Sequence, residues 1–391
     1  MTNSPKTQQT EDGHLLPCDI IATALLTLPF ESNIQFSRVS KWWHGFICGP
    51  DFSKMYFKLA SEQNAICQRL LINTGLKFQT LDVLETPLLS RVRNLTFPFK
   101  QGKQDGVRLL GSCNGLVVVG RSSNQGYRDL SLWNPSTRFF LKLPDDPVFG
   151  TKPKMAREIS SEYYGFGYVS SVDDYKFVFV HHMIASTGSL AKFAFLYSVR
   201  DNSWKSIEMP PRGCYLRHNL GALLNETLHW VSRDINHPTI TAFDLATEQF
   251  RQLPMPVLNN YTIAKQMGVL VLLGECLCVW CSNPVSDDIE FWVMREYNVR
   301  ESWTLLYKFN VANFLGLSNV PSRVVNWKPV WVTESGTVVF KEINKRELIR
   351  IEFHKEEKPI CSGRYKLEEV PEGSWSFDAI QYDQTLISVA N

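Results

Sequence analysis

The stretch "LWNPSTRFFLKLP" (residues 132–144) contains the pattern that decides the fold of this chain. An aromatic residue, Trp133, ends a short apolar run, a polar turn follows, and a second aromatic residue, Phe140, lies on the returning run. Apolar runs on either side of a turn rich in Asn, Asp or Ser are typical of β-hairpins. The stretch is therefore predicted to be a hairpin whose return strand is anchored by an aromatic side chain.

The same pattern recurs along the chain. The further copies are "LYSVRDNSWKSIEMP" (196–210), "AFDLATEQFRQLPMP" (242–256), "EYNVRESWTLLYKF" (296–309) and a degenerate "IEFHKEEKPICSG" (351–363). Strand pairs such as "GSCNGLVVV" (111–119) and "GALLNETLHWV" (221–231) precede some of them. A period near 45 to 50 residues with four strands per unit indicates the blades of a β-propeller.

An all-β domain is thus expected from residue 90 to 391. A single unit would leave its apolar sheet faces in water, so only a closed array is expected to be stable. The segment "SFDAIQYDQTLISV" (376–389) is expected to close the ring. We predict a β-propeller of about six blades, and the uneven spacing of the copies also leaves room for five or seven.

The residues before this domain have a helical sequence pattern and not a strand-like one. The stretch "HLLPCDIIATALLTLPFESNIQFSRVSKWWHGFI" (14–47) is helical in period and is predicted to form three short helices within residues 14–60. The first helix carries its apolar face on Ile20, Ile21, Ala24, Leu25 and Leu28. The second is expected to point Ile34, Phe36 and Val39 inward. The third carries Trp43 and ends at the Gly49-Pro50 break.

The flanking segments complete the predicted domain organisation. Residues 1–13 are polar and are predicted to be a disordered tail, and residues 61–89 are predicted to be a connector. A unit of about 45 residues cannot supply an adequate core alone, so the helical unit is expected to leave apolar surface for a partner.

Composition excludes several classes of protein. The 41 basic and 39 acidic residues give a net charge of +2, which is no electrostatic footprint for nucleic acid. The most apolar run, residues 267–281, is shorter than the roughly 20 residues of a membrane-spanning helix and is read as two buried strands. No signal peptide is recognised, and the nine cysteines are odd in number and scattered. We therefore expect reduced thiols in a cytoplasmic or nuclear protein, with no membrane partner.

Potential reactive groups do not form a catalytic, cofactor or metal site. Cys276, Cys278 and Cys281 are only three thiols, and in a strand the last points away from the other two, so buried cysteines are favoured over a zinc site. His181 and His182 are consecutive in a strand and point to opposite faces. Asp173-Asp174 is expected to form a turn. No catalytic sequence motif is present, so an enzyme is not expected.

The helical stretch resembles an F-box. That pattern is Leu-Pro, an acidic residue, an aliphatic helix that ends in a second Leu-Pro, and Val-x-Lys-x-Trp. The matching residues here are Leu16, Pro17, Asp19, Ile20, Ile21, Leu25, Leu28, Pro29, Val39, Lys41 and Trp43, followed by "GPDF" (49–52). Family members usually have Glu-Ile where this chain has Thr23-Ala24, which weakens the apolar helix face.

The β-rich part resembles the F-box-associated domain of plant F-box proteins, a family that includes F-box/kelch-type and S-locus F-box-like members. The matching phrases are "LLGSCNGLVVV", "LWNPSTR", "YGFGYVSSVDDYKFV", "LHWV", "AFDLATEQF" and "FWVMREYNVRESWT". The resemblance covers about residues 14 to 390. It implies a small all-α F-box of three helices followed by the β-propeller.

The resemblance also implies a function. F-box proteins are non-catalytic substrate receptors of SCF-type (Skp–cullin–F-box) ubiquitin ligases: the F-box docks on a Skp-type adaptor held by a cullin, and the other domain captures the target protein. The expected adaptor contacts are Leu16, Pro17, Ile20, Ile21, Leu28, Pro29, Val39 and Trp43. The alternative is that Leu25, Val39 and Trp43 hold the helices together. Trp43 is the expected hot spot, because a buried indole removes a large area from water.

The target is expected to bind through loops on one face of the propeller. The longer polar loops are expected at 121–129, 145–162, 182–192, 210–219 and 283–288. The second carries Lys152, Lys154 and Arg157 and is the first candidate for target contact, with a solvated insertion as the alternative. The other open function is an F-box-bearing protein that binds a small molecule or glycan without a cullin. The sequence does not identify the target.

Overall fold

The computed structural model describes residues 17–75, 77–83, 92–96, 106–123, 126–145, 147, 156–185, 190–209, 219–232, 238–258, 266–272, 276–315, 326–354, 358–367 and 377–389. The predicted tail, residues 1–13, lies outside this set. The chain divides into two compact units. A helical unit comprises residues 1–66 with 385–390, and a β-rich unit comprises residues 67–384 with 391.

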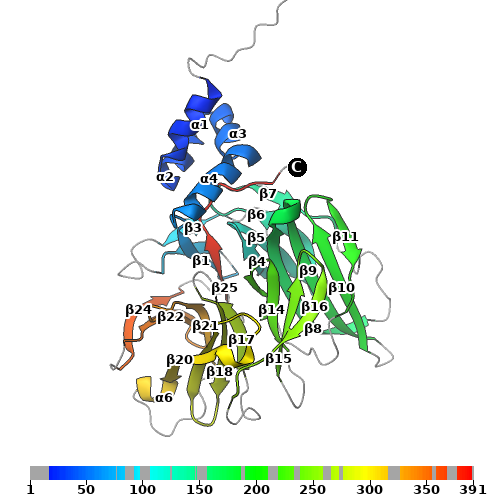
Figure 1. Ribbon diagram of the computed structural model, residues 1–391, viewed down its shortest axis with the longest axis vertical. Helices are drawn as coiled ribbons and strands as arrows, with labels where there is room; N and C mark the ends of the chain where they lie inside the picture. The colour runs from blue at the N-terminus through cyan, green and yellow to red at the C-terminus, as the bar shows by residue number, and fades with distance from the viewer. Residues whose placement is uncertain are drawn as a thin grey trace, which may run out of the picture. The chain divides into compact units, whose positions relative to one another are not determined.

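The described part of the helical unit contains four helices (Figure 1). They are α1 (Cys18–Leu26), α2 (Phe30–Phe36), α3 (Lys41–Ile47) and α4 (Pro50–Glu62). The prediction of three helices is therefore wrong by one. Gly49-Pro50 does end α3, but proline is also favoured in the first turn of a helix, and Asp51 there complements the helix dipole. The same pair of residues thus begins α4.

The core of the helical unit draws on distant parts of the sequence. It is formed by Leu25, Ile47, Cys48, Phe52 and Leu386, and Leu386 is fully buried. The neighbouring Ser388 hydroxyl donates a hydrogen bond to the carbonyl of Cys48. Residues 385–389, predicted as part of the closing strand, thus fill the helical core instead.

The turn between α1 and α2 is fixed by side chains from other helices. The buried Asn33 donates from Nδ2 to the Leu25 carbonyl at 3.0 Å. The Tyr56 hydroxyl of α4 donates to the Leu28 carbonyl at 3.1 Å. These hydrogen bonds tie the end of α1 and the turn after it to α2 and α4.

The β-rich unit contains six sheets, here called blades 1 to 6, within the described residues. Blade 1 comprises β25 (Asp378–Asp383), β1 (Gln68–Asn73), β2 (Phe78–Leu81) and β3 (Arg93–Leu95). Blade 2 comprises β4 (Gly106–Cys113), β5 (Leu116–Ser123), β6 (Gly126–Trp133) and β7 (Phe140–Lys142). Blade 3 comprises β8 (Ala156–Val169), β9 (Asp174–Ala185), β10 (Leu190–Ser198) and β11 (Ser203–Ser206), with β12 (Asn219–Leu220) parallel to β8.

The remaining blades follow the same order. Blade 4 comprises β13 (Ala222–Leu224), β14 (Thr227–Ser232), β15 (Thr239–Asp244) and β16 (Gln249–Leu253). Blade 5 comprises β17 (Gln266–Val271), β18 (Leu277–Asn283), β19 (Asp288–Met294) and β20 (Trp303–Asn310). Blade 6 comprises β21 (Trp327–Val332), β22 (Thr337–Glu342), β23 (Glu347–Glu352) and β24 (Ile360–Lys366). Short helices lie at η1 (Ser170–Val172), η3 (Arg300–Ser302) and α6 (Val311–Phe314).

The six blades form a closed ring. The first strands of successive blades contact one another around the whole circle, in the order β25, β4, β8, β13, β17, β21 and back to β25. Blade 1 is closed by the pairing of β25 with β1, which joins strands from opposite ends of the sequence (Figure 1). The predicted six-bladed propeller is confirmed. The strands β1 and β2 lie in the range 61–89, for which the sequence predicted a connector.

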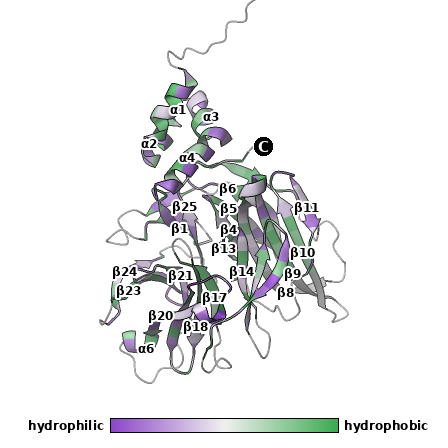
Figure 2. Cartoon of the chain, in the orientation of Figure 1, coloured by the Kyte–Doolittle hydropathy of each residue, from purple (hydrophilic) through white to green (hydrophobic). Residues whose placement is uncertain are grey.

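Apolar clusters are shared between neighbouring blades. Blades 5 and 6 meet around Phe291, Trp327 and Phe340, and blades 3 and 4 meet around Val178, Leu228 and Trp230. Blades 2 and 3 approach so closely that a Cβ on Gly111 would lie 2.6 Å from the Cβ of Phe166. Figure 2 shows the hydrophobic stretches within the sheets and helices in green. Each blade therefore buries its faces against its neighbours, as a closed array requires.

The predicted hairpins are the outer strand pairs of the blades. Trp133 pairs directly with Phe140, Tyr197 with Trp204, and Phe243 with Phe250. In blade 5 the pairing differs, because Trp303 lies opposite Met294 and Tyr297 lies in the turn. The degenerate copy is confirmed as the β23–β24 pair.

Candidate interaction surfaces

The helical unit exposes some of its predicted adaptor contacts and buries others. Ile20 and Val39 are 51% and 67% exposed. Pro17 and Pro29 also lie at the surface. Three more predicted contacts pack partly against the core of the unit, namely Ile21, Leu28 and Trp43. Leu16 lies outside the described residues.

An aromatic row that the sequence did not predict runs from α2 to α3. Phe36, which is 41% exposed, contacts Trp43 with ring centroids 5.8 Å apart. Trp43 meets Trp42 at 5.2 Å, and Trp42 stacks on Phe46 at 5.2 Å. The inward orientation predicted for Phe36 is wrong. Residues two positions apart in a helix point in nearly opposite directions, so Phe36 cannot share the face of the half-buried Ile34.

Val39 is likewise not inward, because it follows the end of α2 and points to solvent. On α1, the hydroxyl of the exposed Thr23 donates a hydrogen bond to the Asp19 carbonyl at 2.8 Å. Ala24 beside it is also exposed. The Thr23-Ala24 pair therefore lies on the surface, where it presents less apolar area than the Glu-Ile of the F-box pattern.

The propeller has two unlike faces. Because the four strands of a blade alternate in direction, turns between its first and second and between its third and fourth strands lie on one face. We call this the turn face, and its turns include 114–115, 134–139, 170–173, 199–202, 225–226 and 245–248. The opposite face, here called the connection face, holds the strand ends from which the chain passes to the next blade. These connections span 96–105, 143–155, 207–218, 254–265, 311–326 and 367–377.

The turn face is held by side-chain caps at equivalent positions of different blades. In blade 2, Asn134 Oδ1 accepts from the amide of Ser136 at 2.8 Å. In blade 4, Asp244 Oδ1 accepts from the amide of Thr247 at 2.8 Å. These are Asx turns, which the repeated polar residues of the hairpin pattern predict.

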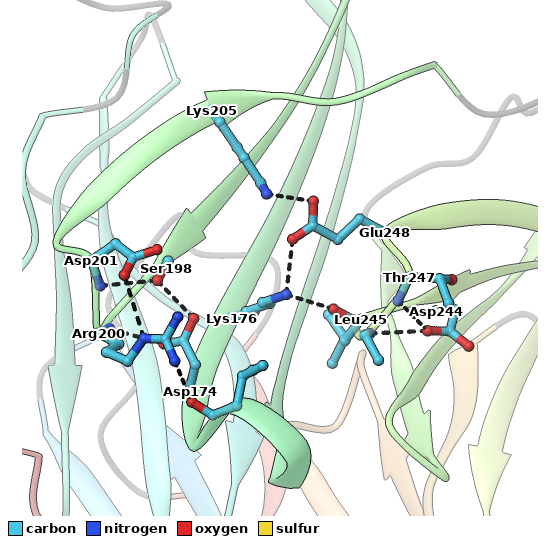
Figure 3. A network of polar contacts seen from close by, with 12 residues as sticks. Asp174, Lys176, Ser198, Arg200, Asp201, Lys205, Asp244, Leu245, Thr247 and Glu248 are labelled. Atoms are coloured by element: carbon cyan, nitrogen blue, oxygen red, sulfur yellow. Dashed lines mark hydrogen bonds and ion pairs between the residues drawn. The ribbon is translucent and has the colours of Figure 1, made fainter.

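A charged network on the turn face joins blades 3 and 4 (Figure 3). The Lys176 ammonium, almost buried, donates to Glu248 and to the Leu245 carbonyl, both at 2.8 Å. Lys205 pairs with the other carboxylate oxygen of Glu248. Burial acts to raise the pKa of Glu248, but hydrogen bonds and charges from the two lysines outweigh it and lower that pKa. The network thus fastens the β15–β16 turn to the neighbouring blade.

Asp173 and Asp174, expected to form a turn, belong to the same face. Asp173 adopts a left-handed backbone with φ 49°, and Asp174 accepts from the Ser198 hydroxyl at 2.7 Å and from the Arg200 amide at 2.9 Å (Figure 3). The predicted turn role is confirmed.

The described strand ends that border the five ranges proposed for target contact lie at the connection face. Ranges 121–129, 182–192 and 283–288 join second to third strands, and 145–162 and 210–219 join blades. The strands reach further into these ranges than predicted, since β8 already begins at Ala156. Lys152 and Lys154 lie outside the described residues, and so does the side chain of Arg157. Cys67 and Gln384, the ends of the β-rich unit, are hydrogen-bonded to each other and lie on the turn face.

The groups considered for chemistry have packing roles. Cys278 and Cys281 are buried in different apolar clusters, and burial with the Glu290 charge raises the pKa of Cys281 to about 12. His181 is buried against Phe179, with ring centroids 3.5 Å apart. Among the described residues, no group of three or more His, Cys, Asp or Glu side chains could hold a metal ion. No helix in the described part of the chain has the length and apolar character needed to span a membrane.

Comparisons with known proteins agree with this architecture. Residues 79–389 match the family described as F-box associated beta propeller domain. The F-box protein CPR1 of Arabidopsis thaliana is 31% identical over 312 residues, which cover 75% of this chain and 72% of that protein. The F-box protein At3g07870 of the same plant is 26% identical over 366 residues, with 83% and 79% covered. The F-box/kelch-repeat protein At3g23880, also from Arabidopsis thaliana, is 24% identical over 350 residues, with 86% and 87% covered.

Proposed function

The chain belongs to the family of proteins with an F-box associated beta propeller domain, and from this premise we propose that it is a substrate receptor of an SCF-type ubiquitin ligase. In this proposal the helical unit docks on a Skp-type adaptor that is held by a cullin. The connection face of the propeller binds a target protein. The chain makes and breaks no bond itself, and it acts by holding target lysines near the ubiquitin carrier.

The observation that carries the adaptor half of the proposal is the exposed apolar surface of the helical unit. Its core is already filled, yet Ile20, Phe36 and Val39 remain 41% to 67% exposed. Several large apolar side chains left exposed on so small a unit are typical of a surface that a partner covers. Trp43, the proposed hot spot, is half-buried and its ring contacts that of Phe36, so in this proposal it both binds the adaptor and positions Phe36.

The target-binding part of the proposal rests on the difference between the two faces of the propeller. Turns on the turn face are short and fastened by caps and ion pairs, and both ends of the β-rich unit lie there. The described strand ends that lead to the next blade lie at the other face, and loops carried by a rigid scaffold suit recognition. The F-box/kelch and S-locus subtypes stay predictions.

The test is co-expression with a Skp-type adaptor followed by size-exclusion chromatography. We expect the wild type to co-elute with the adaptor. Ile20→Lys and Val39→Lys should each abolish or strongly weaken co-elution, because each places a charge in an apolar interface. Val285→Lys is the matched control, since Val285 is 77% exposed on the connection face.

One further variant tests the α1 face, and two outcomes would contradict the proposed adaptor binding. Thr23→Glu/Ala24→Ile should strengthen adaptor binding if the weakened α1 face limits it. Full co-elution of both lysine variants, with unchanged circular dichroism, would move the adaptor site elsewhere. Failure of the wild type to co-elute would contradict the receptor function.

A further inference from the structure

The buried core of the helical unit is completed by a residue that follows the last propeller strand. The helices contribute Leu25, Ile47, Cys48 and Phe52 to this core, and the fifth buried member is Leu386, which is fully buried. The helices α1, α2 and α3 have only nine, seven and seven residues. Helices this short are not stable in water without packing partners. The helical unit therefore depends on its packing, and Leu386 supplies part of it.

Several predicted adaptor contacts pack on the same core. Ile21, Leu28 and Trp43 are partly buried against the cluster that contains Leu386. Protein interiors are close-packed, so a void at one position is felt by the side chains that line it. The positions of these adaptor contacts are therefore tied to a residue far from them in the sequence.

A hydrogen bond provides a second link to the helices. The Ser388 hydroxyl donates to the carbonyl of Cys48, which is the C-cap residue of α3. Because α3 carries Trp43, this hydrogen bond fixes the end of the helix that presents the proposed hot spot. Residues 385–389, here called the strap, thus hold the helices of the adaptor surface through both an apolar and a polar contact.

The strap directly follows the strand that closes the propeller. β25 pairs with β1 over the whole length of both strands. Next to this pairing, the Gln384 amide donates to the Cys67 carbonyl at 2.8 Å. Only Thr385 separates Gln384 from Leu386. Closure of the ring therefore brings the start of the strap to Cys67, the first residue after the helices and their following turn.

Ring closure also lowers the entropic cost of placing the strap. Ser388 and Cys48 are 340 positions apart in the sequence. In the closed ring, a shorter path between them runs through residues 48–67, the Cys67–Gln384 hydrogen bond and residues 384–388. Loop-closure entropy grows with the logarithm of loop length, so this shortening favours the strap contact by roughly fiftyfold. The helical core is thus completed more readily after β25 has paired with β1 than before.

We propose that the strap positions the adaptor-binding helices and makes adaptor binding depend on closure of the propeller ring, an inference that rests on the proposed receptor function. Leu386 and Ser388 are positioning residues that act through Trp43 and its neighbours. A chain in which β25 is unpaired lacks the last residue of the helical core, so fewer of its molecules hold the adaptor surface in its binding form. The apparent affinity falls with that fraction, and the adaptor therefore selects chains whose propeller is closed.

The first experiment measures the affinity of the full chain for a Skp-type adaptor by isothermal titration calorimetry. Leu386→Ala removes atoms on which the adaptor contacts pack and should weaken binding about tenfold or more. Leu386→Met nearly conserves the volume of the side chain and should restore most of the affinity. Leu196→Ala is the matched control, because Leu196 is also fully buried but belongs to the cluster between blades 3 and 4. It should lower the melting temperature of the propeller and leave the adaptor affinity unchanged.

The second experiment separates ring closure from the strap. A Gly/Ser linker of about 20 residues, which behaves as a flexible coil and contains a site for a sequence-specific protease, is inserted between Gln384 and Thr385. The uncut protein should bind the adaptor several-fold more weakly than the wild type, because the longer tether lowers the effective concentration of the strap. Cutting should lower the affinity to that of Leu386→Ala or below, while the melting temperature of the propeller stays the same. Wild-type protein treated with the protease is the control.

The outcomes distinguish the strap from the receptor function. Unchanged affinity in Leu386→Ala or after cutting, or an equal loss in Leu196→Ala, would overturn the role of the strap and leave the receptor function in place. A wild type that does not bind the adaptor would contradict the receptor function, and amide hydrogen exchange in α1 and α3 would then decide the role of the strap. Cutting should speed that exchange about tenfold or more and leave exchange in blades 3 to 5 unchanged. Equal exchange before and after cutting would mean that the helices keep their form without the strap.

Discussion

The two faces of the propeller use charge in opposite ways. On the turn face, Lys176 and Lys205 share the carboxylate of Glu248, and the polar groups of the turns are capped at short range. On the connection face, Lys328 and Lys341 are cross-strand partners, so two like charges lie opposite each other. Opposite charges in contact stabilise a scaffold, whereas like charges directly opposite each other on paired strands lower its stability. The comparison separates charges that fasten neighbouring blades from charges that cost the propeller stability.

The largest expected effect tests the turn face. Glu248→Ala would leave Lys176 nearly buried with only the Leu245 carbonyl as acceptor, and should lower the free energy of unfolding by about 3 kcal/mol. Lys205→Ala removes the exposed partner of the same carboxylate and should cost about 0.5 kcal/mol. Urea denaturation of both variants measures the difference. Equal losses would mean that the network contributes no more than an ordinary surface ion pair.

The second expected effect is a loss of folding stability in acid, caused by a buried histidine near the turn face. His229 is buried between blades 4 and 5, with Nδ1 3.1 Å from the Ala222 carbonyl and Nε2 2.7 Å from the Tyr297 hydroxyl. Burial lowers its pKa to about 4. The unfolded chain, with a pKa near 6.5, binds the proton first, so stability falls as pH drops from about 6.5 towards 4. The expected loss between pH 7 and pH 5 is about 2 kcal/mol.

His229→Gln is the variant that isolates this titration. Glutamine retains one donor and one acceptor but cannot be protonated, so its stability should depend less on pH in that window. Thermal unfolding from pH 5 to pH 7 provides the measurement. A wild-type slope that persists in His229→Gln would assign the acid sensitivity to other groups.

The third expected effect is a rise in stability at alkaline pH, and it is caused by Lys341 on the connection face. Because the pKa of Lys341 is lowered to about 8, its charge opposes folding at neutral pH, and stability should rise as pH increases from about 8 to 10.5. Lys341→Met should therefore be more stable than the wild type at pH 7, by about 2 kcal/mol, and should lack that alkaline rise. Chemical denaturation at pH 7 and pH 9.5 tests both statements. A destabilised Lys341→Met protein would show that the ammonium contributes more through its contact with Phe377 than its burial costs.

Features that depend on neighbouring residues were predictable from the sequence, whereas contacts between distant segments were not. The hairpins, the turn role of Asp173-Asp174 and the number of blades follow from local alternation and turn chemistry, which a few neighbouring residues determine. Arg108 and Asp378, which form an ion pair, are 270 residues apart, and nothing in either local stretch indicates that β25 returns to the ring beside β4. Leu386 is a similar case, since its helical partners lie more than 300 positions earlier. The orientation of Phe36 was predictable from helix geometry, because Ile34 and Phe36 cannot share one face.

The smallest expected effect compares one turn type on the two faces. Asn134 on the turn face and Asn283 on the connection face each accept an amide hydrogen bond two residues ahead, at 2.8 and 2.9 Å. Asn134 is fully buried and Asn283 is half-buried. Asn134→Ala should cost about 1.5 kcal/mol, because buried amides lose their acceptor, and Asn283→Ala about 0.5 kcal/mol, because water can replace it. Equal costs in urea denaturation would mean that the Asx turn itself, and not the packing of the turn face, determines the stability of these hairpins.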